Sequence, residues 1–524
     1  MCPQSYDKKM KAPSFLSIIL VVSEIMFTFA LSNDENTENM VINFSIISKI
    51  LGSLLFIEAF FMACCLCMAF AFHEDDVMAF AASVLLTLAS AFTFLFFGHG
   101  ASNSLSRRDA YVVVSLTWVV FSFFGMFPFI IHGSLPSVTD AYFETMSGFS
   151  TTGVTIIDDV ERLPHGLLFW RSLMQWIGGL GIVFFTVALL PQLVGGSVKV
   201  FSAEATGPMR SKMHPRLSTS AKWIWSIYIL LTVACGLSFW AAGMDWFDAT
   251  NYSMSTTATG GFSTHNGSIF MASPLNQYLA TLFQFLAGVN FTLLYVSIFK
   301  LKMGTLMRNG EFRFYILVTL LSTLIITALL VTEMDYGLEY AFRMALFQVV
   351  SFLTTTGLTS TDAGAWPHIT WAILALLMFC GACSGSTTGG FKSIRMLMLL
   401  KVVRNEFRHI IHPNAVLPVK VDGMSVPQGR IVSLLAFFIL YVIAVILVIV
   451  IMAANGIHIT NAVTISLSLV CNVGAGLDTN IGPQMSWADL SPALKWLCSW
   501  LMLVGRLEIV AVLVLFTRSF WKEN

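Results

Sequence analysis

Long apolar segments constrain the fold of this chain more than any other feature. Eleven of them, each at least 20 residues long, cover residues 13–32, 43–72, 77–98, 110–133, 166–194, 222–244, 275–301, 312–333, 370–400, 430–454 and 493–518. A membrane-crossing helix needs about 20 apolar residues, so on the order of ten helices could span a bilayer. Only 11% of the residues are charged, which is too few to cover a water-facing surface. We expect an all-α polytopic membrane protein.

The charge balance and the cysteines exclude other classes. The 29 basic residues equal the 29 acidic ones, so no basic excess exists to bind nucleic acid. The cysteines lie mostly in apolar runs, where they act as small apolar residues. Cys380 and Cys383 have the spacing of a redox pair or metal clip, but no second pair or nearby histidine completes such a site. We interpret them as structural.

A pattern of long apolar run, shorter segment, Thr/Ser/Gly cluster and second apolar run occurs four times after residue 106. Its anchor glycines, Gly153, Gly260, Gly357 and Gly474, lie 107, 97 and 117 residues apart. Each shorter segment has a polar or Met start followed by Ala, at residues 140, 248, 344 and 461. Three of these starts are good helix N-caps. Small residues also allow close helix packing, but four clusters in register favour a repeated unit.

The short segments predict re-entrant helices. About ten residues make a helix of about 15 Å, which cannot cross a hydrocarbon core of about 30 Å. Irregular backbone at that depth is tolerated only where protein buries it or where it lines a wet cavity. We therefore predict helix, half-helix, loop and helix in each repeat, with four repeats around one axis. The predicted divisions are an apolar segment at 1–33, a two-helix region at 34–105, and repeats at 106–200, 201–303, 304–410 and 411–524.

The positions of basic residues predict the topology. Twenty of them fall at the ends of the repeated region or between repeats, and the positive-inside rule places that side in the cytoplasm. They are Arg107, Arg108, Lys199, Arg210, Lys212, Arg216, Lys222, Lys300, Lys302, Arg308, Arg313, Lys392, Arg395, Lys401, Arg404, Arg408, Lys420, Arg430, Arg518 and Lys522. The four loops then open outward. Segment 13–32 breaks this parity, and a signal peptide, an interfacial helix and an outward-facing N-terminus all stay open for it.

The clusters offer carbonyls and hydroxyls without charge. A ring of such oxygens suits a weakly hydrated monovalent cation, whereas a divalent ion prefers carboxylates. The negative ends of the half-helix dipoles also favour a cation at the axis, and glycine allows backbone angles that turn carbonyls inward. Rival classes fit less well. A hydrolase needs a single site rather than four copies, and a coupled carrier usually has midplane carboxylates, whereas only Glu58 lies deep in a span, outside the repeats.

Two features below the loops suggest control. Residues 381–390 interrupt the apolar run 370–400, and eight of the ten are Gly, Ser or Thr, so they form a poor helix there. They form either a passive kink or a movable gate. Arg506 lies inside the last apolar run, where an arginine is costly unless it faces a pore or a partner. It either pairs with Glu508 or with loop carbonyls, or it raises the barrier to cations, and both roles are compatible.

Residues 141–155, 171–181, 260–264, 381–390 and 505–509 closely resemble the TrkH/KtrB family of bacterial potassium uptake proteins. The resemblance runs from about residue 43 to the end. It implies one pseudo-fourfold pore of four M1–P–M2 repeats, preceded by extra N-terminal helices. It also implies a selectivity filter formed by Thr151, Thr152, Gly153, Thr259, Gly260, Thr355, Thr356, Gly357, Asn472, Val473 and Gly474. The implied gate comprises Gly381, Gly385, Ser386, Thr387, Thr388, Gly389, Gly390 and Arg506.

The same resemblance implies the cargo and the partners. Potassium is the transported ion, and Gly153 favours it over sodium, because serine at that position accompanies sodium preference in plant relatives. No organic cofactor and no enzymatic activity are expected. The expected partners are membrane lipid, a second copy of the chain and a cytosolic nucleotide-binding regulatory subunit of the TrkA type, in the bacterial cytoplasmic membrane. A sodium/potassium or proton-coupled symporter of the same fold is the alternative.

Overall fold

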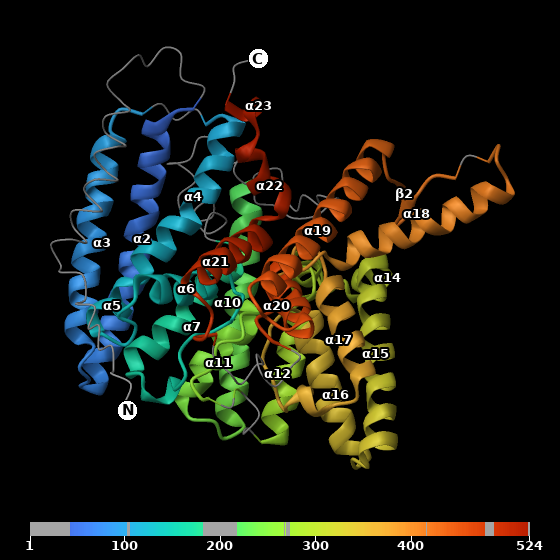
Figure 1. Cartoon of the computed structure of the whole chain (residues 1–524), viewed down its shortest axis with the longest axis horizontal. Coiled ribbons are helices and arrows are strands. Elements are labelled where there is room, and N and C mark those ends of the chain that lie inside the picture. Colours follow the sequence, from blue (N-terminus) through green and yellow to red (C-terminus); the bar gives the residue numbers. More distant parts are fainter. Residues whose placement is uncertain are drawn as a thin grey trace, which may run out of the picture.

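The computed structural model describes residues 42–101, 105–181, 217–266, 268, 273–415, 417–476 and 487–521. This part is almost entirely helical (Figure 1). Two helices come first, α2 (Phe44–Phe72) and α3 (Val77–Phe97). Segment 13–32 and the second half of segment 166–194 lie outside the described residues, so the expectations for them are untested.

Four stretches of helices follow, and each has the predicted order of long helix, short helix, loop and helix. The first contains α4 (Arg107–Gly125), α5 (Phe127–His132), α6 (Val138–Phe149), the turn η1 (Val160–Arg162) and α7 (His165–Gly179). The second contains α10 (Leu217–Ala241), α11 (Trp246–Ala258), α12 (Pro274–Ala287) and α13 (Phe291–Phe299). We call these stretches repeats 1 and 2.

Repeats 3 and 4 have the same order. Repeat 3 contains α14 (Met303–Arg308), α15 (Gly310–Met334), α16 (Leu338–Leu353), the turn η2 (Ala363–Ala365), α17 (His368–Cys380) and α18 (Ser393–Ile411). A hairpin of β1 (Lys420–Val421) and β2 (Met424–Ser425) precedes repeat 4, and its antiparallel register pairs Lys420 with Ser425. Repeat 4 contains α19 (Gln428–Ala454), α20 (Ile459–Cys471), α21 (Pro492–Leu507), α22 (Ile509–Leu513), η3 (Val514–Phe516) and α23 (Arg518–Trp521).

The membrane-spanning helices can be counted only within the described residues. Among the described residues, six helices are long and apolar enough, or up to eight if each bent pair counts as one span. The bent pairs are α12 with α13, at 104°, and α21 with the segment 509–516, at 113°. The sequence estimate of about ten spans counts the whole chain, and residues 13–32 and 182–194 of it lie outside the described part. Within the described part, three of the apolar runs are broken or bent into two helices: α12 with α13, α17 with α18, and α21 with α22.

The short helices α6, α11, α16 and α20 begin earlier than predicted. They have 12, 13, 16 and 13 residues, and their N-caps are Ser137, Asp245, Gly337 and His458. The predicted caps at residues 140, 248 and 461 are therefore wrong. Asp140 and Asp248 lie in the first turn instead, where a carboxylate also stabilises the N-terminal end of the helix dipole. All four helices are still too short to cross a hydrocarbon core.

Packing of the short helices closes a ring. Each one contacts the helix that follows the loop of the preceding repeat: α11 packs on α7, α16 on α12, α20 on α17, and α6 on α21. The last of these contacts joins repeat 1 to repeat 4, so the four repeats surround one centre. The α2–α3 pair lies outside the ring, where α2 packs on α4 and α7 (Figure 1).

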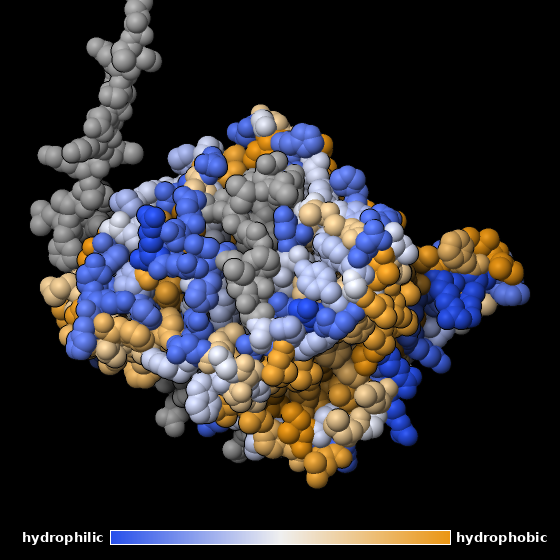
Figure 2. All heavy atoms as spheres, turned by 90° about the horizontal axis from the view of Figure 1, so that it is seen from below, coloured by the Kyte–Doolittle hydropathy of each residue, from blue (hydrophilic) through white to orange (hydrophobic). Residues whose placement is uncertain are grey.

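One element leaves the compact body. Helix α18 and the β1–β2 hairpin project to one side in Figure 1. On the face seen from below in Figure 2, hydrophilic side chains gather toward the middle and hydrophobic ones along parts of the edge. Two residues counted among the cytoplasmic basic groups, Lys392 and Arg395, are buried. They lie where α17 breaks and α18 begins, which is inside the protein rather than in a loop.

Candidate functional site

The four loops after the short helices share one backbone conformation. One residue, one or two positions after the end of each short helix, has a left-handed backbone conformation. A glycine with positive φ comes two residues after it. The left-handed residues are Thr151, Thr259, Thr355 and Asn472, with φ of 56°, 55°, 54° and 54°. The glycines are Gly153, Gly261, Gly357 and Gly474, with φ of 83°, 84°, 74° and 80°. Only glycine adopts this region without steric cost, so the four loops have the same local requirement.

This geometry corrects the predicted register of repeat 2 by one residue. The counterpart of the other three glycines is Gly261, whereas Gly260 corresponds to Thr152, Thr356 and Val473. The backbone N–H of these four residues donates to the carbonyl of the serine five positions earlier, at 2.9, 3.0, 2.8 and 2.8 Å for Gly260, Thr152, Thr356 and Val473. Those serines, Ser147, Ser255, Ser351 and Ser468, stand six residues before the positive-φ glycine in every repeat. This six-residue spacing is a sequence signal that could have identified Gly261, but the sequence analysis did not use it.

The glycines and carbonyls form a closed ring. A Cβ atom added to each positive-φ glycine would come closer than 3.0 Å to a carbonyl oxygen of the next repeat: Gly153 to Gly260, Gly261 to Thr356, Gly357 to Val473 and Gly474 to Thr152. The contacts run from repeat 1 to 2, 3, 4 and back to 1. We call these eight residues the carbonyl ring. It presents backbone oxygens without a charged side chain, which can replace the water around a monovalent cation.

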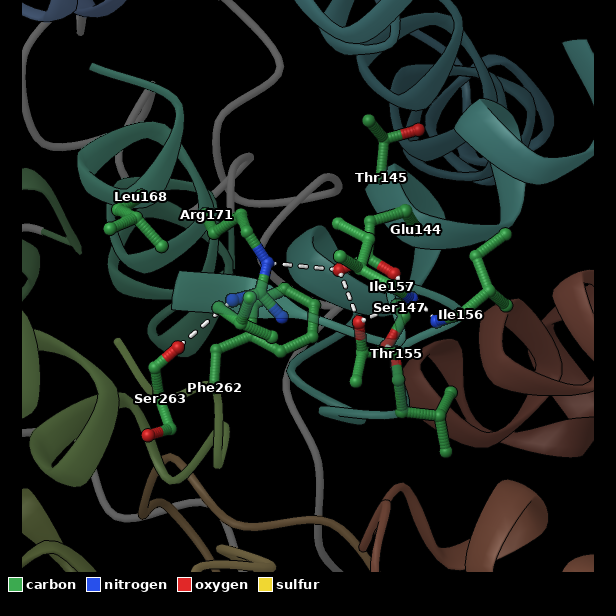
Figure 3. A network of polar contacts seen from close by, with 12 residues as sticks. Glu144, Thr145, Ser147, Thr155, Ile156, Ile157, Leu168, Arg171, Phe262 and Ser263 are labelled. Carbon is green, nitrogen blue, oxygen red and sulfur yellow. Dashed lines mark hydrogen bonds and ion pairs between the residues drawn. The ribbon is translucent and has the colours of Figure 1, made fainter. Parts of the chain in front are cut away.

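A buried ion pair supports the outer side of the ring (Figure 3). Arg171 Nε of α7 lies 3.0 Å from Glu144 Oε1 of α6, and the two side chains are 2% and 0% exposed. Glu144 also accepts from the Thr155 hydroxyl at 3.0 Å and from the Ile156 N–H at 3.1 Å. Arg171 donates to the Ser263 carbonyl at 2.9 Å. The pair therefore connects the loop of repeat 1 with the loop of repeat 2.

The residue nine positions before the positive-φ glycine supports the loop in three repeats. It is Glu144 in repeat 1, Tyr252 in repeat 2 and Gln348 in repeat 3. The Tyr252 hydroxyl is 2.7 Å from the Ser263 hydroxyl, and Gln348 Nε2 donates to the Thr361 carbonyl at 3.0 Å. The sequence analysis missed these roles because the side chains differ chemically from repeat to repeat.

A cavity of about 60 Å³ lies outside the carbonyl ring, and its lining includes all four positive-φ glycines together with Asp158, His265 and Asn266. His265 Nε2 is 2.9 Å from Asp248, and its Nδ1 is 3.4 Å from Glu161. The bond to Asp248 raises the pKa of His265 above its ordinary value near 6.5. The lining of this cavity therefore includes a histidine held between two carboxylates.

The interrupted segment 381–390 lies on the opposite side of the ring, against the ends of the short helices. Its backbone forms hydrogen bonds with residues that lie one or two positions before the carbonyl-ring residues of repeats 3 and 4. The Gly389 N–H donates to the Thr355 hydroxyl at 2.7 Å, and the Gly390 N–H donates to the Cys471 carbonyl at 3.0 Å. The Thr387 hydroxyl donates to the Thr257 carbonyl at 3.1 Å. Gly381, Gly385 and Gly390 have positive φ, and Ser386 and Thr388 share a hydrogen bond of 2.8 Å.

Arg506 joins this segment to repeat 1. Its guanidinium donates to the Thr387 carbonyl at 2.9 Å, to the Gly179 carbonyl at 2.6 Å and to the Gly178 carbonyl. Of the two partners predicted for Arg506, loop carbonyls are therefore present. Glu508 forms an ion pair of 2.5 Å with Arg395.

Comparison with known proteins shows the family of this chain. The family model TrkH, described as a cation transport protein, matches residues 76–523. The chain belongs to the TrkH family. The Trk system potassium uptake protein TrkH of Halomonas elongata is 37% identical over 486 residues, which cover 91% of this chain and 99% of that protein. TrkH of Escherichia coli strain K12 is 35% identical over 485 residues, covering 92% and 100%.

A solved relative agrees in three dimensions. The crystal structure of the potassium transporter TrkH from Vibrio parahaemolyticus superposes with a TM-score of 0.83 at 33% identity, covering 92% of this chain and 100% of that one. The family resemblance and the helical membrane fold predicted from the sequence are thus confirmed. This TrkH family member is a multi-pass membrane protein, and its relatives are named as transporters rather than enzymes.

Proposed function

We propose that this TrkH family member takes up potassium through the carbonyl ring, which acts as the selectivity filter. The closed contact of four glycines with four carbonyl oxygens is the observation that supports this most directly. Neutral backbone oxygens replace the hydration shell of potassium without trapping the ion. The similar proteins from Halomonas elongata and Escherichia coli carry the name potassium uptake protein. The membrane potential supplies about 2.3 kcal/mol per charge per 100 mV to drive entry.

We do not favour the coupled symporter. Carriers of that class usually place carboxylates at the ion site. In the described part of the chain, the deeply buried Glu58 belongs to α2 and lies beside Gly125 of α4, outside the carbonyl ring.

Segment 381–390 and Arg506 form the proposed gate below the filter. The hydrogen bonds from Gly389 and Gly390 to Thr355 and Cys471 hold the segment against the filter. Arg506 holds it to the end of α7 and places a positive charge under the ring. A cation that leaves the ring toward the cytoplasm meets both barriers, so displacement of the segment would open the path.

The projecting helix α18 is the proposed contact surface for partners. One stripe of apolar side chains on it is exposed, at Leu400, Val403, Phe407, Ile410 and Ile411. An exposed apolar stripe of this kind marks an interaction site. We propose a homodimer in the bacterial cytoplasmic membrane, regulated by a cytosolic nucleotide-binding subunit of the TrkA type. The projecting α18 and hairpin would lie on the cytoplasmic side, as the basic residues predict.

The test is potassium uptake in a bacterial strain without its own potassium importers, with the wild-type chain and with Gly153→Ser. The serine has to adopt a φ of +83°, and its Cβ overlaps the Gly260 carbonyl, so the potassium preference over sodium is expected to fall. A wild-type chain that reaches the membrane without restoring uptake would refute the function. An unchanged ion preference in Gly153→Ser would refute the filter assignment at this position.

A further inference from the structure

Repeat 2 lacks a side chain at one position of the carbonyl ring. The other three repeats have Thr152, Thr356 and Val473 there, whereas repeat 2 has Gly260. A Cβ atom on Gly260 would come within 3.0 Å of three side-chain atoms of Gln175. Gln175 belongs to α7 of repeat 1 and is fully buried. The space for the missing side chain is therefore filled by a residue of the preceding repeat.

Gln175 fixes the loop of repeat 2 at two points. Its Nε2 donates to the Gly260 carbonyl at 2.7 Å, and its Oε1 accepts from the Phe262 N–H at 3.1 Å. The Ser255 hydroxyl also donates to Oε1, at 2.9 Å. In repeats 1 and 3 the corresponding serines, Ser147 and Ser351, instead donate to a carbonyl of their own loop, both at 2.6 Å. In repeat 2, the glutamine side chain takes the place of that contact.

The next repeat boundary provides an internal comparison. Gln284 occupies the same place in α12, since the Tyr315 hydroxyl donates to the Phe285 carbonyl as the Tyr228 hydroxyl donates to the Trp176 carbonyl. Gln284 is also fully buried, but its amide has no hydrogen-bond partner within the described part of the chain. The residue that it would face, Thr356, has a side chain of its own. The tether is therefore specific to the boundary where the ring residue is glycine.

We propose that Gln175 is a positioning residue that sets ion selectivity by holding the Gly260 carbonyl in the ring. This inference rests on the proposed filter function. Gly260 and Gly261 are consecutive glycines, so this loop has the greatest backbone freedom of the four. Without the tether the Gly260 carbonyl rotates and closes around the smaller sodium ion. One hydrogen bond of this kind is modest, and we expect the potassium preference over sodium to fall about fivefold, which corresponds to about 1 kcal/mol.

The experiment compares Gln175→Met, Gly260→Val and the double variant Gln175→Ala/Gly260→Val, and it measures potassium uptake against competing sodium at equal membrane abundance. Gln175→Met keeps the volume but removes the donor, so the preference falls. Gly260→Val alone overlaps Gln175 and also lowers it. The double variant gives repeat 2 the side chain that repeat 4 has at Val473, frees Ser255 to bond its own loop, and restores most of the preference. Gln284→Met is the matched control and leaves the preference unchanged.

The outcomes separate this inference from the filter function. Suppose that the wild-type chain restores potassium uptake. The inference is then wrong, and the filter function stands, if Gln175→Met keeps the wild-type preference for potassium over sodium, or if Gln284→Met lowers this preference as much as Gln175→Met does. A double variant that is no better than either single change also contradicts it, since a merely structural glutamine predicts additive losses. If the wild-type chain does not transport potassium, the proposed function itself fails.

Discussion

Substitution of the two neighbouring glycines of repeat 2 distinguishes their roles. Gly261→Ala places a side chain on a residue with a φ of +84° and directs its Cβ at the Thr356 carbonyl of the ring. For Gly260→Ala, the three atoms nearest to the added Cβ all belong to the side chain of Gln175, and the φ of Gly260 lies outside the left-handed region. The first change strains the backbone and displaces a ring oxygen, whereas the second displaces one side chain.

The expected magnitudes differ accordingly. A left-handed alanine costs about 1–2 kcal/mol, and forcing a carbon into packed backbone costs about 1–3 kcal/mol more. Gly261→Ala should therefore weaken ion binding in the ring by at least about 2 kcal/mol, or about 30-fold. Gly260→Ala loses the hydrogen bonds of one glutamine, a net of about 1 kcal/mol. That loss corresponds to about a fivefold weakening of ion binding, so Gly261→Ala should weaken ion binding about sixfold more than Gly260→Ala does, or by a larger factor.

The assay is potassium uptake and its inhibition by sodium in an importer-deficient strain, normalised to the amount of protein in the membrane. Gly304→Ala is the control, because an added Cβ there has no neighbour within 4 Å. The register of repeat 2 would be refuted by the reverse order, in which Gly260→Ala abolishes potassium preference and Gly261→Ala retains it.

Three further changes test the surroundings of the ring. Arg506→Ala should raise potassium flux because it removes the charge and the anchor of segment 381–390; a stable variant with reduced flux would indicate a purely structural arginine. Arg171→Met leaves the buried Glu144 without its ion-pair partner and should lower the free energy of unfolding by about 3–5 kcal/mol. Thermal denaturation in detergent measures this loss, and the double variant Arg171→Met/Glu144→Gln should recover part of it. Asp248 raises the pKa of His265 above 6.5, so His265 loses its proton only when the external pH rises above that value. Loss of the proton makes the cavity more negative, and the KM for potassium should then fall. His265→Gln should remove this pH dependence of the KM.

The repeated unit could be predicted from the sequence because its causes are local. Apolar runs of sufficient length and short segments with polar starts determine helix order without knowledge of packing. The helix starts were placed a few residues late, since an acidic residue is favourable both at the N-cap and within the first turn. Asp140 and Asp248 occupy that first turn, and no local pattern distinguishes the two positions.

The register and the polar partners depend on three-dimensional contacts. Gly260 and Gly261 are adjacent residues of the same type. Only the ring contacts and the position of Ser255, six residues before Gly261, distinguish them. Glu144 and Arg171 are 27 residues apart, and Arg506 and Gly179 are 327 apart. Such pairs follow from how α6 packs on α7 and how repeat 4 closes on repeat 1. The sequence predicts that Arg506 needs a pore or a partner, because an arginine within a membrane-spanning run is costly, but it leaves the partner open.

The carbonyl ring is fourfold in its backbone but not in its supports. All four loops have a left-handed residue, a backbone hydrogen bond to the carbonyl of a serine in the short helix, and a glycine with positive φ. Each loop needs these features because it has to turn a carbonyl toward the same centre. The side chains that hold those loops differ: Glu144 with Arg171 in repeat 1, Tyr252 with Gln175 in repeat 2, and Gln348 in repeat 3. A ring made by four identical subunits cannot vary its supports in this way, whereas a single chain can. Equivalent substitutions at the four glycines should therefore have unequal effects, and the loop of repeat 2, with two consecutive glycines and a borrowed side chain, should be the most sensitive to changes outside the ring.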